Sequence, residues 1–150
     1  MQWLSGPVAE VTALLSAQLF SQPIAGRQYA GRVTPWPPAQ PVAPCAWLEV
    51  TSGTRGFDDA LWLTLVEVVL CVDGEGDSAH ELLYALGDRC IAIVTAPSAQ
   101  RAHDMIVTGT RPVSLDVGGP SLRGLAVTIE VAMPAPTMCS PALLEGARHG

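Results

Sequence analysis

The sequence contains no lysine, and its eight basic residues are all arginines scattered singly along the chain. The formal net charge is −6, with a sequence pI of about 4.8. Nucleic-acid phosphates are bound by clustered cations, so this balance argues against nucleic acid as a direct partner. Charged residues make up 15% of the chain, against about 25% in an average domain. A surface so poor in charge suggests that other protein covers part of it.

Leader, membrane and zinc signals are also missing. Residues Met1–Ser5 have neither a basic region nor a continuous apolar core, so we expect no signal peptide. The apolar run Leu61–Val72 is too short to cross a bilayer and contains Glu67. None of the cysteines has CxxC spacing, which favours reduced, structural thiols in a cytosolic chain over a zinc site. They are Cys45, Cys71, Cys90 and Cys139.

Catalytic motifs are missing as well. The chain has no G-x-S-x-G elbow, no P-loop and no HExxH helix. Asp58 and Asp59 are adjacent, and neighbouring residues of an extended segment face opposite ways, which disfavours a shared proton. His80, His103 and His149 have no carboxylate or thiol at a motif spacing. We therefore predict a protein that is not an enzyme and that uses no cofactor or metal.

The most informative stretch runs from Phe57 to Ile93. Leu61–Val72 is rich in β-branched residues and apolar on both faces, which predicts a central strand covered by helices on one side. At about 3.3 Å per residue it would extend about 40 Å, longer than most strands. We expect a paired strand of the same chain or a neighbouring subunit to support that length.

The strand is followed by the acidic turn Asp73–Asp77 and a helix over Ser78–Ile93. Ser78 and Glu81 match a capping box, so we expect them to cap this helix. Gly74–Ala79 also fits the dinucleotide pattern G-x-G-x-x-A. Three carboxylates there would repel a pyrophosphate at the helix N-terminus. The same carboxylates alternate as the first ligands of a Ca²⁺ loop do, but the rest of such a loop is absent. We therefore favour a simple capped turn.

The other segments complete an α+β pattern. We expect a helix over Val8–Phe20 capped by Ser5, a weak extended segment over Gly26–Val33, a polar loop over Ser52–Asp59, and strands over the remaining apolar segments. Those strands are Ala46–Thr51, Met105–Thr108 with Arg111–Val117, and Leu122–Met133, with a turn at Gly118-Gly119 before the last. The prediction is a mixed, mainly antiparallel sheet of about four to five strands with two helices on one face. Residues 1–133 would form a single domain, and residues 134–150 an irregular C-terminal arm.

The segment Pro35–Pro44 is too rich in proline for regular structure. One interpretation is a stiff surface loop. The other is a pre-ordered arm that docks on a partner or a second subunit, with Trp36, Pro37 and Pro38 in the contact. Trp62, on the long strand, is a further candidate for such a contact. Both interpretations stay open.

The order of these elements resembles the tail terminator proteins (tail completion or neck proteins) of long-tailed, non-contractile bacteriophages. The resemblance covers the chain to Met133, at the level of pattern and size, and rests on no diagnostic motif. It is carried by the N-terminal helix, the Gly/Pro-rich stretch, the strand pair around the Asp58-Asp59 loop, the acidic turn with its helix, and the closing strands. The Pro-rich segment and the tail 134–150 have no obvious counterpart in a minimal terminator.

The resemblance implies a homo-hexameric ring in the virion neck, assembled in the host cytoplasm. The ring would cap the tail tube, contact the tube protein and the head-side connector, end tail polymerisation and leave a channel for DNA without binding it specifically. Asp58, Asp59, Glu75 and Asp77 are candidates to line that channel, or they are solvated turn residues. The alternatives are another connector ring (a stopper or adaptor) and a small α+β ligand-binding or regulatory module.

Overall fold

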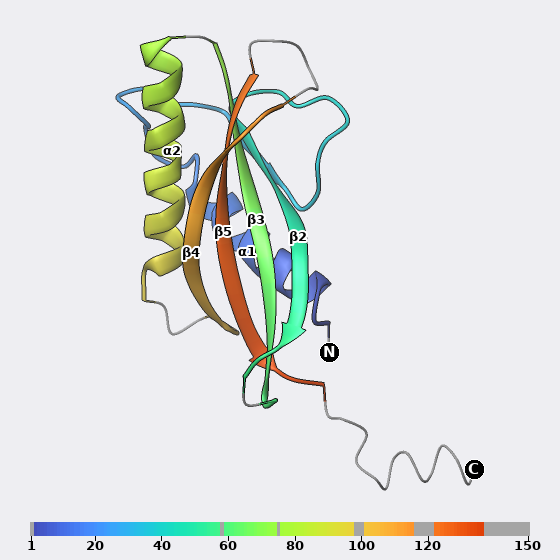
Figure 1. The fold of residues 1–150 in the computed structure, drawn as a ribbon. Helices are drawn as coiled ribbons and strands as arrows, with labels where there is room; N and C mark the ends of the chain where they lie inside the picture. The colour runs from blue at the N-terminus through green and yellow to red at the C-terminus, as the bar shows by residue number, and fades with distance from the viewer. Residues whose placement is uncertain (1, 58, 75, 98–100, 116–121, 137–150) are drawn as a thin grey trace, which may run out of the picture.

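The computed structural model describes residues 2–57, 59–74, 76–97, 101–115 and 122–136. Within them the predicted α+β class is confirmed, with two helices and a five-stranded sheet (Figure 1). In chain order the elements are α1 (Ser5–Gln18), β1 (Arg32–Thr34), β2 (Cys45–Arg55), β3 (Leu61–Asp73), α2 (Asp77–Thr95), β4 (Asp104–Val113) and β5 (Leu122–Pro134).

The sheet is mixed and mainly antiparallel, with the strand order β1-β2-β3-β5-β4. β3 is central, as its apolar character on both faces predicts, and it pairs with β2 on one side and β5 on the other. The pairing with β5 runs from Leu61↔Pro134 to Asp73↔Leu122 without a break. Only the short β1 is parallel to its neighbour. The length of β3 is therefore supported by strands of its own chain.

One face of the sheet carries the main core. Alternate residues of β3 point toward the helices, and Val66, Val68, Leu70 and Val72 are fully buried there. α1 contributes Val11, Leu15 and Leu19 to the same cluster, and α2 contributes a longer apolar stripe that includes Leu86 and Val94. In Figure 1, α1 lies behind the strands, and α2 runs beside β4.

The other face has no helix over the described strands (Figure 1). Its buried part is a small cluster of Cys45, Trp47, Val69 and Cys71, partly covered by Ala43, Leu115 and Leu122. Further along the strands the face becomes polar, and an ion pair described below crosses it. Because Val69 and Cys71 of β3 belong to the small cluster, β3 is apolar on both sides although helices cover only one.

The hairpin of β2 and β3 extends past the packed body (Figure 1). The predicted loop Ser52–Asp59 is wrong over its first half, because β2 continues to Arg55, which pairs with Trp62. A bulge between Val50 and Ser52 breaks the regular alternation. This half of β2 is mostly exposed, so its residues are polar and resemble a loop.

Both predicted helix caps are wrong. α1 begins at Ser5 itself, the residue before it is Leu4 in a helical conformation, and no side chain caps the helix. α2 begins at Asp77 after Gly76, whose φ of 83° suits glycine. Ser78 therefore lies inside the helix and makes no cap hydrogen bond to it. In both cases the helix starts earlier than the capping pattern indicates.

Two strand predictions also change in extent. The segment Met105–Thr108 and the first part of Arg111–Val117 belong to one strand, β4, which ends at Val113 and has a bulge between Val107 and Gly109. Ser114 and Leu115 lie outside the strand, and residues 116–117 lie outside the described residues. The weak segment Gly26–Val33 contributes only the start of β1. The predicted turn at Gly118-Gly119 lies outside the described residues, and so does the arm beyond Pro136.

Candidate functional site

An apolar hollow lies where the N-terminus of α1 meets the edge of the sheet. It has a volume of about 590 Å³. Its lining is mostly carbon and comprises Gln2, Leu4, Ser5, Val8, Ala9, Pro35, Trp36 and Val50. Three of these apolar side chains stay in contact with solvent: Trp36 is 69% exposed, Leu4 50% and Val50 37%. We call Leu4, Pro35, Trp36 and Val50 the edge patch.

Local structure holds Trp36 in this position. It lies two residues after the end of β1, and the hydroxyl of Thr34 donates a hydrogen bond of 2.9 Å to the Trp36 carbonyl oxygen. Pro35 and Pro37 on either side restrict the backbone further. Of the other predicted docking residues, Pro37 is exposed and Pro38 is half-buried. The Pro-rich segment is thus an ordered loop with its indole displayed at the surface.

Trp62 lies next to the edge patch but beneath it. A Cβ placed on Gly53 would come within 2.8 Å of the Trp62 ring and 3.0 Å of the Leu4 side chain, so both pack over this glycine. The Trp62 side chain is half-buried, and its indole nitrogen is buried without a hydrogen-bond partner among the described residues. A polar group left in this state is a site where a further acceptor would be favourable.

The four predicted channel residues are not brought together. Asp59, with a φ of 58°, is exposed in the turn between β2 and β3, and Asp77 is exposed at the first turn of α2. These positions flank opposite ends of β3, which at about 3.3 Å per residue separates them by roughly 40 Å. Asp58 and Glu75 lie outside the described residues. No single acidic ring can therefore contain both Asp59 and Asp77 of one subunit.

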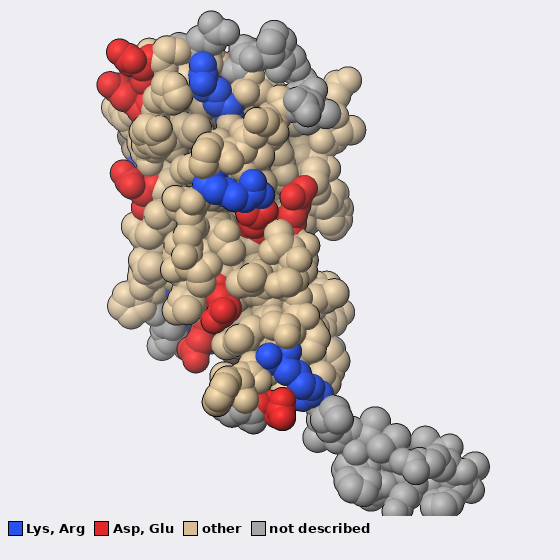
Figure 2. Space-filling view, in the orientation of Figure 1, with Lys and Arg blue, Asp and Glu red and all other residues tan. Residues whose placement is uncertain are grey.

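The helix-free face carries an ion pair that spans three strands. Arg111 of β4 donates two hydrogen bonds of 2.8 Å to the carboxylate of Glu67 on β3, across β5. Glu67 is buried, whereas the Arg111 side chain is 57% exposed. This contact raises the pKa of the Arg111 guanidinium. Glu49 is the register partner of Glu67 on β2, so two carboxylates face one arginine here. In Figure 2 the charges on this side form isolated spots separated by uncharged surface.

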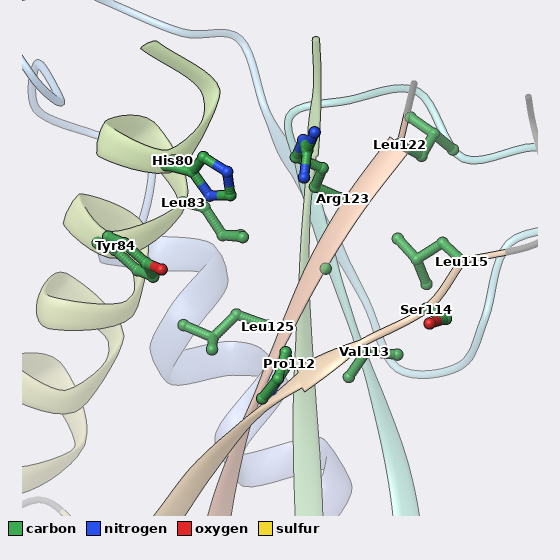
Figure 3. A pocket seen from close by; sticks show the side chains of 11 residues that line it. His80, Leu83, Tyr84, Pro112, Val113, Ser114, Leu115, Leu122, Arg123 and Leu125 are labelled. Atoms are coloured by element: carbon green, nitrogen blue, oxygen red, sulfur yellow. The ribbon is translucent and has the colours of Figure 1, made fainter. Parts of the chain in front are cut away.

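A second hollow, of about 350 Å³, lies between α2 and the ends of β4 and β5 (Figure 3). His80 and Tyr84 enter it from α2, with their ring centres 6.0 Å apart and stacked. Arg123 enters from β5 and donates a hydrogen bond of 3.2 Å to the Gly74 carbonyl oxygen. Ser114 also lines the hollow, but no hydrogen bond joins it to His80 among the described contacts. The hollow has a cation and aromatic groups without a nucleophile–base pair.

The acidic turn that matches G-x-G-x-x-A opens a split βαβ unit, in which β3 and β4 run parallel with β5 between them, and no second βαβ unit follows it among the described strands. α2 connects β3 to β4, and both of these strands pair antiparallel to β5, which lies between them. Among the described residues, no group of three or more His, Cys, Asp or Glu side chains is arranged to hold a metal ion. No helix in the described ranges is both long enough and apolar enough to cross a membrane.

Sequence reasoning missed three polar contacts that join distant segments. His103 Nδ1 lies 3.0 Å from the Glu10 carboxylate, tying the start of β4 to α1. Arg89 of α2 donates to carbonyl oxygens beyond α1, and Glu67 pairs with Arg111. Each pair is separated by more than 40 residues. No local spacing could have indicated them.

The sequence matches no protein-family model and no curated protein.

Proposed function

We propose that this protein is a structural ring subunit of the tail terminator type. Six copies would close a ring that caps a phage tail tube, joins it to the head-side connector and leaves a channel for DNA. The observation that carries the proposal is the edge patch, an exposed apolar surface beside a strand edge that no described strand pairs with. The element order that resembles tail terminators gives the proposal its narrower form.

The free edge belongs to the outer half of β2. β1 pairs only with Cys45–Trp47, so among the described strands nothing pairs with the outer edge of β2 from Leu48 to Arg55. An unpaired edge is a template for another chain, and an apolar patch beside it favours burial. A second copy that contacts this region would cover both features at once.

The opposite edge of the sheet is poorly suited to the same role. In β4, Pro112 lacks an amide proton, a bulge follows Val107, and Arg111 turns its side chain inward to Glu67. These are features that block strand addition at an edge. The two edges are thus not self-complementary. A head-to-tail contact, in which the edge patch meets a different surface of the next subunit, closes into rings when the rotation allows.

The charge of the chain suits a channel for DNA. The net charge of −6 per subunit would be multiplied six-fold in the ring, and the arginines are scattered. A negatively charged lumen repels phosphates and lets DNA pass without specific binding. Asp59 and Asp77 would then line different levels of the channel. The edge patch would lie between subunits, and Trp62 would be sealed beneath it.

The test is the mass of the purified protein by native mass spectrometry, with electron microscopy of the same sample. We expect six-subunit rings, alone or on addition of tail tubes. Trp36→Ser should shift the population toward monomer, because it removes the centre of the edge patch. Ile106→Ser is the matched control, since Ile106 is 56% exposed on β4, at the other edge. A monomer that ignores tail tubes, or Trp36→Ser rings as abundant as wild type, would refute the proposal.

The second hollow favours one alternative, a small ligand-binding module. Arg123, His80 and Tyr84 around a partly apolar space of about 350 Å³ suit a small anionic ligand with an apolar part. A bound ligand raises the melting temperature. A panel of small carboxylates and phosphates that stabilises the monomer, with the effect lost in Arg123→Met, would favour this function over the ring.

A further inference from the structure

Two of the described cysteines face each other across the first two antiparallel strands. Cys45, the first residue of β2, is the register partner of Cys71 on β3. Both belong to the small buried cluster on the helix-free face, where Cys45 is 5% exposed and Cys71 0%. Both are free thiols. Directly opposed residues on antiparallel strands point to the same face, so the two sulfur atoms share one site.

The separation suits a covalent link. Directly opposed residues in an antiparallel pair have Cα atoms about 4.5–5.5 Å apart. A disulfide spans Cα separations of about 4.4–6.8 Å. The link therefore needs rotation of the two side chains rather than movement of the strands. Cys90, the other described cysteine, is buried alone in the helix-side core.

The two thiols are already in contact and are chemically unequal. A hydrogen bond from the Cys71 thiol lowers the pKa of Cys45. The same contact, with burial, raises the pKa of Cys71. Of the two thiols, Cys45 is thus the one that ionises more readily. This inequality resembles the division between an attacking and a resolving cysteine.

Cys45 also has a route to solvent. It lines a small hollow of about 90 Å³ beneath the Pro-rich loop. The other lining residues are Arg32, Thr34, Pro38, Gln40 and Val42. A liquid water occupies about 30 Å³, so the space admits a molecule as small as hydrogen peroxide but not a bulky oxidant. Cys71 is not among the lining residues, and an oxidant would reach Cys45 first.

We propose that Cys45 and Cys71 form a peroxide-oxidised, reversible disulfide that closes the base of the β2–β3 hairpin. The Cys45 thiolate attacks one oxygen of hydrogen peroxide, the O–O bond breaks, and the hydroxide that leaves is protonated to water. The Cys71 sulfur then attacks the sulfur of the Cys45 sulfenic acid, and the S–O bond breaks. The proton of Cys71 leaves with that hydroxyl as a second water. Two thiols are oxidised to one disulfide, and one peroxide is reduced to two waters.

The test uses the full-length chain with Cys139→Ser, which removes the one cysteine outside the described residues. The reduced protein is treated with hydrogen peroxide, unfolded, alkylated with a maleimide, and analysed by intact mass and peptide mapping. We expect two of the three remaining thiols to become unreactive, so that the intact mass is that of the chain less two hydrogens with one maleimide adduct instead of three. Peptide mapping should give a peptide linked through Cys45 and Cys71. Dithiothreitol should reverse all three changes. The disulfide should raise the melting temperature by about 10 °C, because it constrains the unfolded chain.

Two variants separate the roles of the thiols. With Cys71→Ser, oxidation should stop at a Cys45 sulfenic acid, which dimedone traps as an adduct. With Cys45→Ser, peroxide consumption should fall at least ten-fold, and Cys71 should stay alkylatable. Wild-type mapping does not depend on how the variants fold. Cys45 and Cys71 that both remain alkylatable after treatment, or a dimedone adduct on Cys71 instead of Cys45, would overturn the proposal.

Discussion

Arg89 joins α2 to the chain that leaves α1. Its guanidinium donates hydrogen bonds to three carbonyl oxygens: Leu19 at 3.4 Å, Gln22 at 2.7 Å and Pro23 at 2.5 Å. The last carbonyls of a helix lack partners within it, and a cation near them is favourable. One side chain of α2 therefore fixes the end of α1 and the turn after it.

The size of this contribution follows from the geometry. The two short contacts are charge-assisted hydrogen bonds, and the third is long. Hydrogen bonds to charged groups contribute about 1.5–3 kcal/mol each when well shielded, and less where water competes. Arg89 is only half-buried, so we expect Arg89→Met to lower the free energy of unfolding by about 2.5 kcal/mol. For a chain of 150 residues, whose unfolding entropy is about 0.3 kcal/mol per kelvin, this is a fall in Tm of about 8 °C.

Urea titration and calorimetry of the same variants would measure both quantities. Arg89→Lys keeps the charge but loses the planar fork, so it should recover less than half of the loss. Arg27→Met is the matched control, because Arg27 is an exposed arginine and should change stability by less than about 0.5 kcal/mol. An Arg89→Met variant as stable as the Arg27→Met control would show that the three carbonyls are satisfied equally well by water.

Three further predictions concern the core and its cysteine. Burial raises the pKa of the Cys90 thiol to about 12, whereas a thiol in the unfolded chain has a pKa near 8.5. The contribution of the buried, neutral thiol to stability is therefore full below pH 8.5 and is lost as the pH rises toward 12. In urea titrations between about pH 9 and 11, the free energy of unfolding of wild type should fall with pH more steeply than that of Cys90→Ala, by up to about 1.4 kcal/mol per pH unit. Equal slopes for the two proteins would contradict the raised pKa of Cys90. Leu86→Ala should lower the free energy of unfolding by about 3 kcal/mol, because Leu86 is fully buried between α2 and the sheet; a loss below about 1 kcal/mol in denaturant would mean that the core collapses into the space. In Gly31→Ala the new methyl group would lie 2.4 Å from the Phe20 ring, and the variant should be less stable by about 1–3 kcal/mol in thermal melts. Gly109→Ala is the control, because nothing lies within 4 Å of its new methyl group, and it should melt near wild type.

The strands were the most predictable part of the fold. The prediction of Leu61–Val72 differs from β3 by one residue, and that of Leu122–Met133 differs from β5 by one. Both segments combine β-branched residues with a period of two, so local preference and burial agree. β2 and β3, which are neighbours in the sequence, pair antiparallel as a hairpin.

The ends of elements were less predictable, for a physical reason. A capping box describes what Ser78 and Glu81 could do if the helix began there, but Gly76 allows the turn to close earlier. β2 continues through polar residues because β3 supplies hydrogen bonds along its whole edge. A glycine conformation decides the start of α2, and pairing with β3 decides the extent of β2; the capping and alternation patterns describe neither.

The candidate site was predictable only in part. The Pro-rich composition indicated an irregular segment, and Pro35–Pro44 has neither helix nor strand. Trp36 in it is exposed. The neighbours that turn it into a patch are Leu4, just before α1, and Val50 on β2, and they meet only in the fold. The cysteine pair was equally hidden, since the separation of Cys45 and Cys71 in the sequence fits no motif. Register brings them together, and register is a property of the paired strands.

The pairing of the strands weakens one argument that the protein assembles with other subunits and strengthens another. A strand as long as β3 suggests a neighbouring subunit when it is considered alone, but β5 pairs with it from end to end and β2 pairs with it from Trp62 to Cys71. Its length therefore gives no evidence for a partner. The outer half of β2 is different, because it supports β3 while its own far edge pairs with no described strand. This unpaired edge, with the apolar side chains of Trp36 and Val50 beside it, is the surface through which we propose that a second subunit binds.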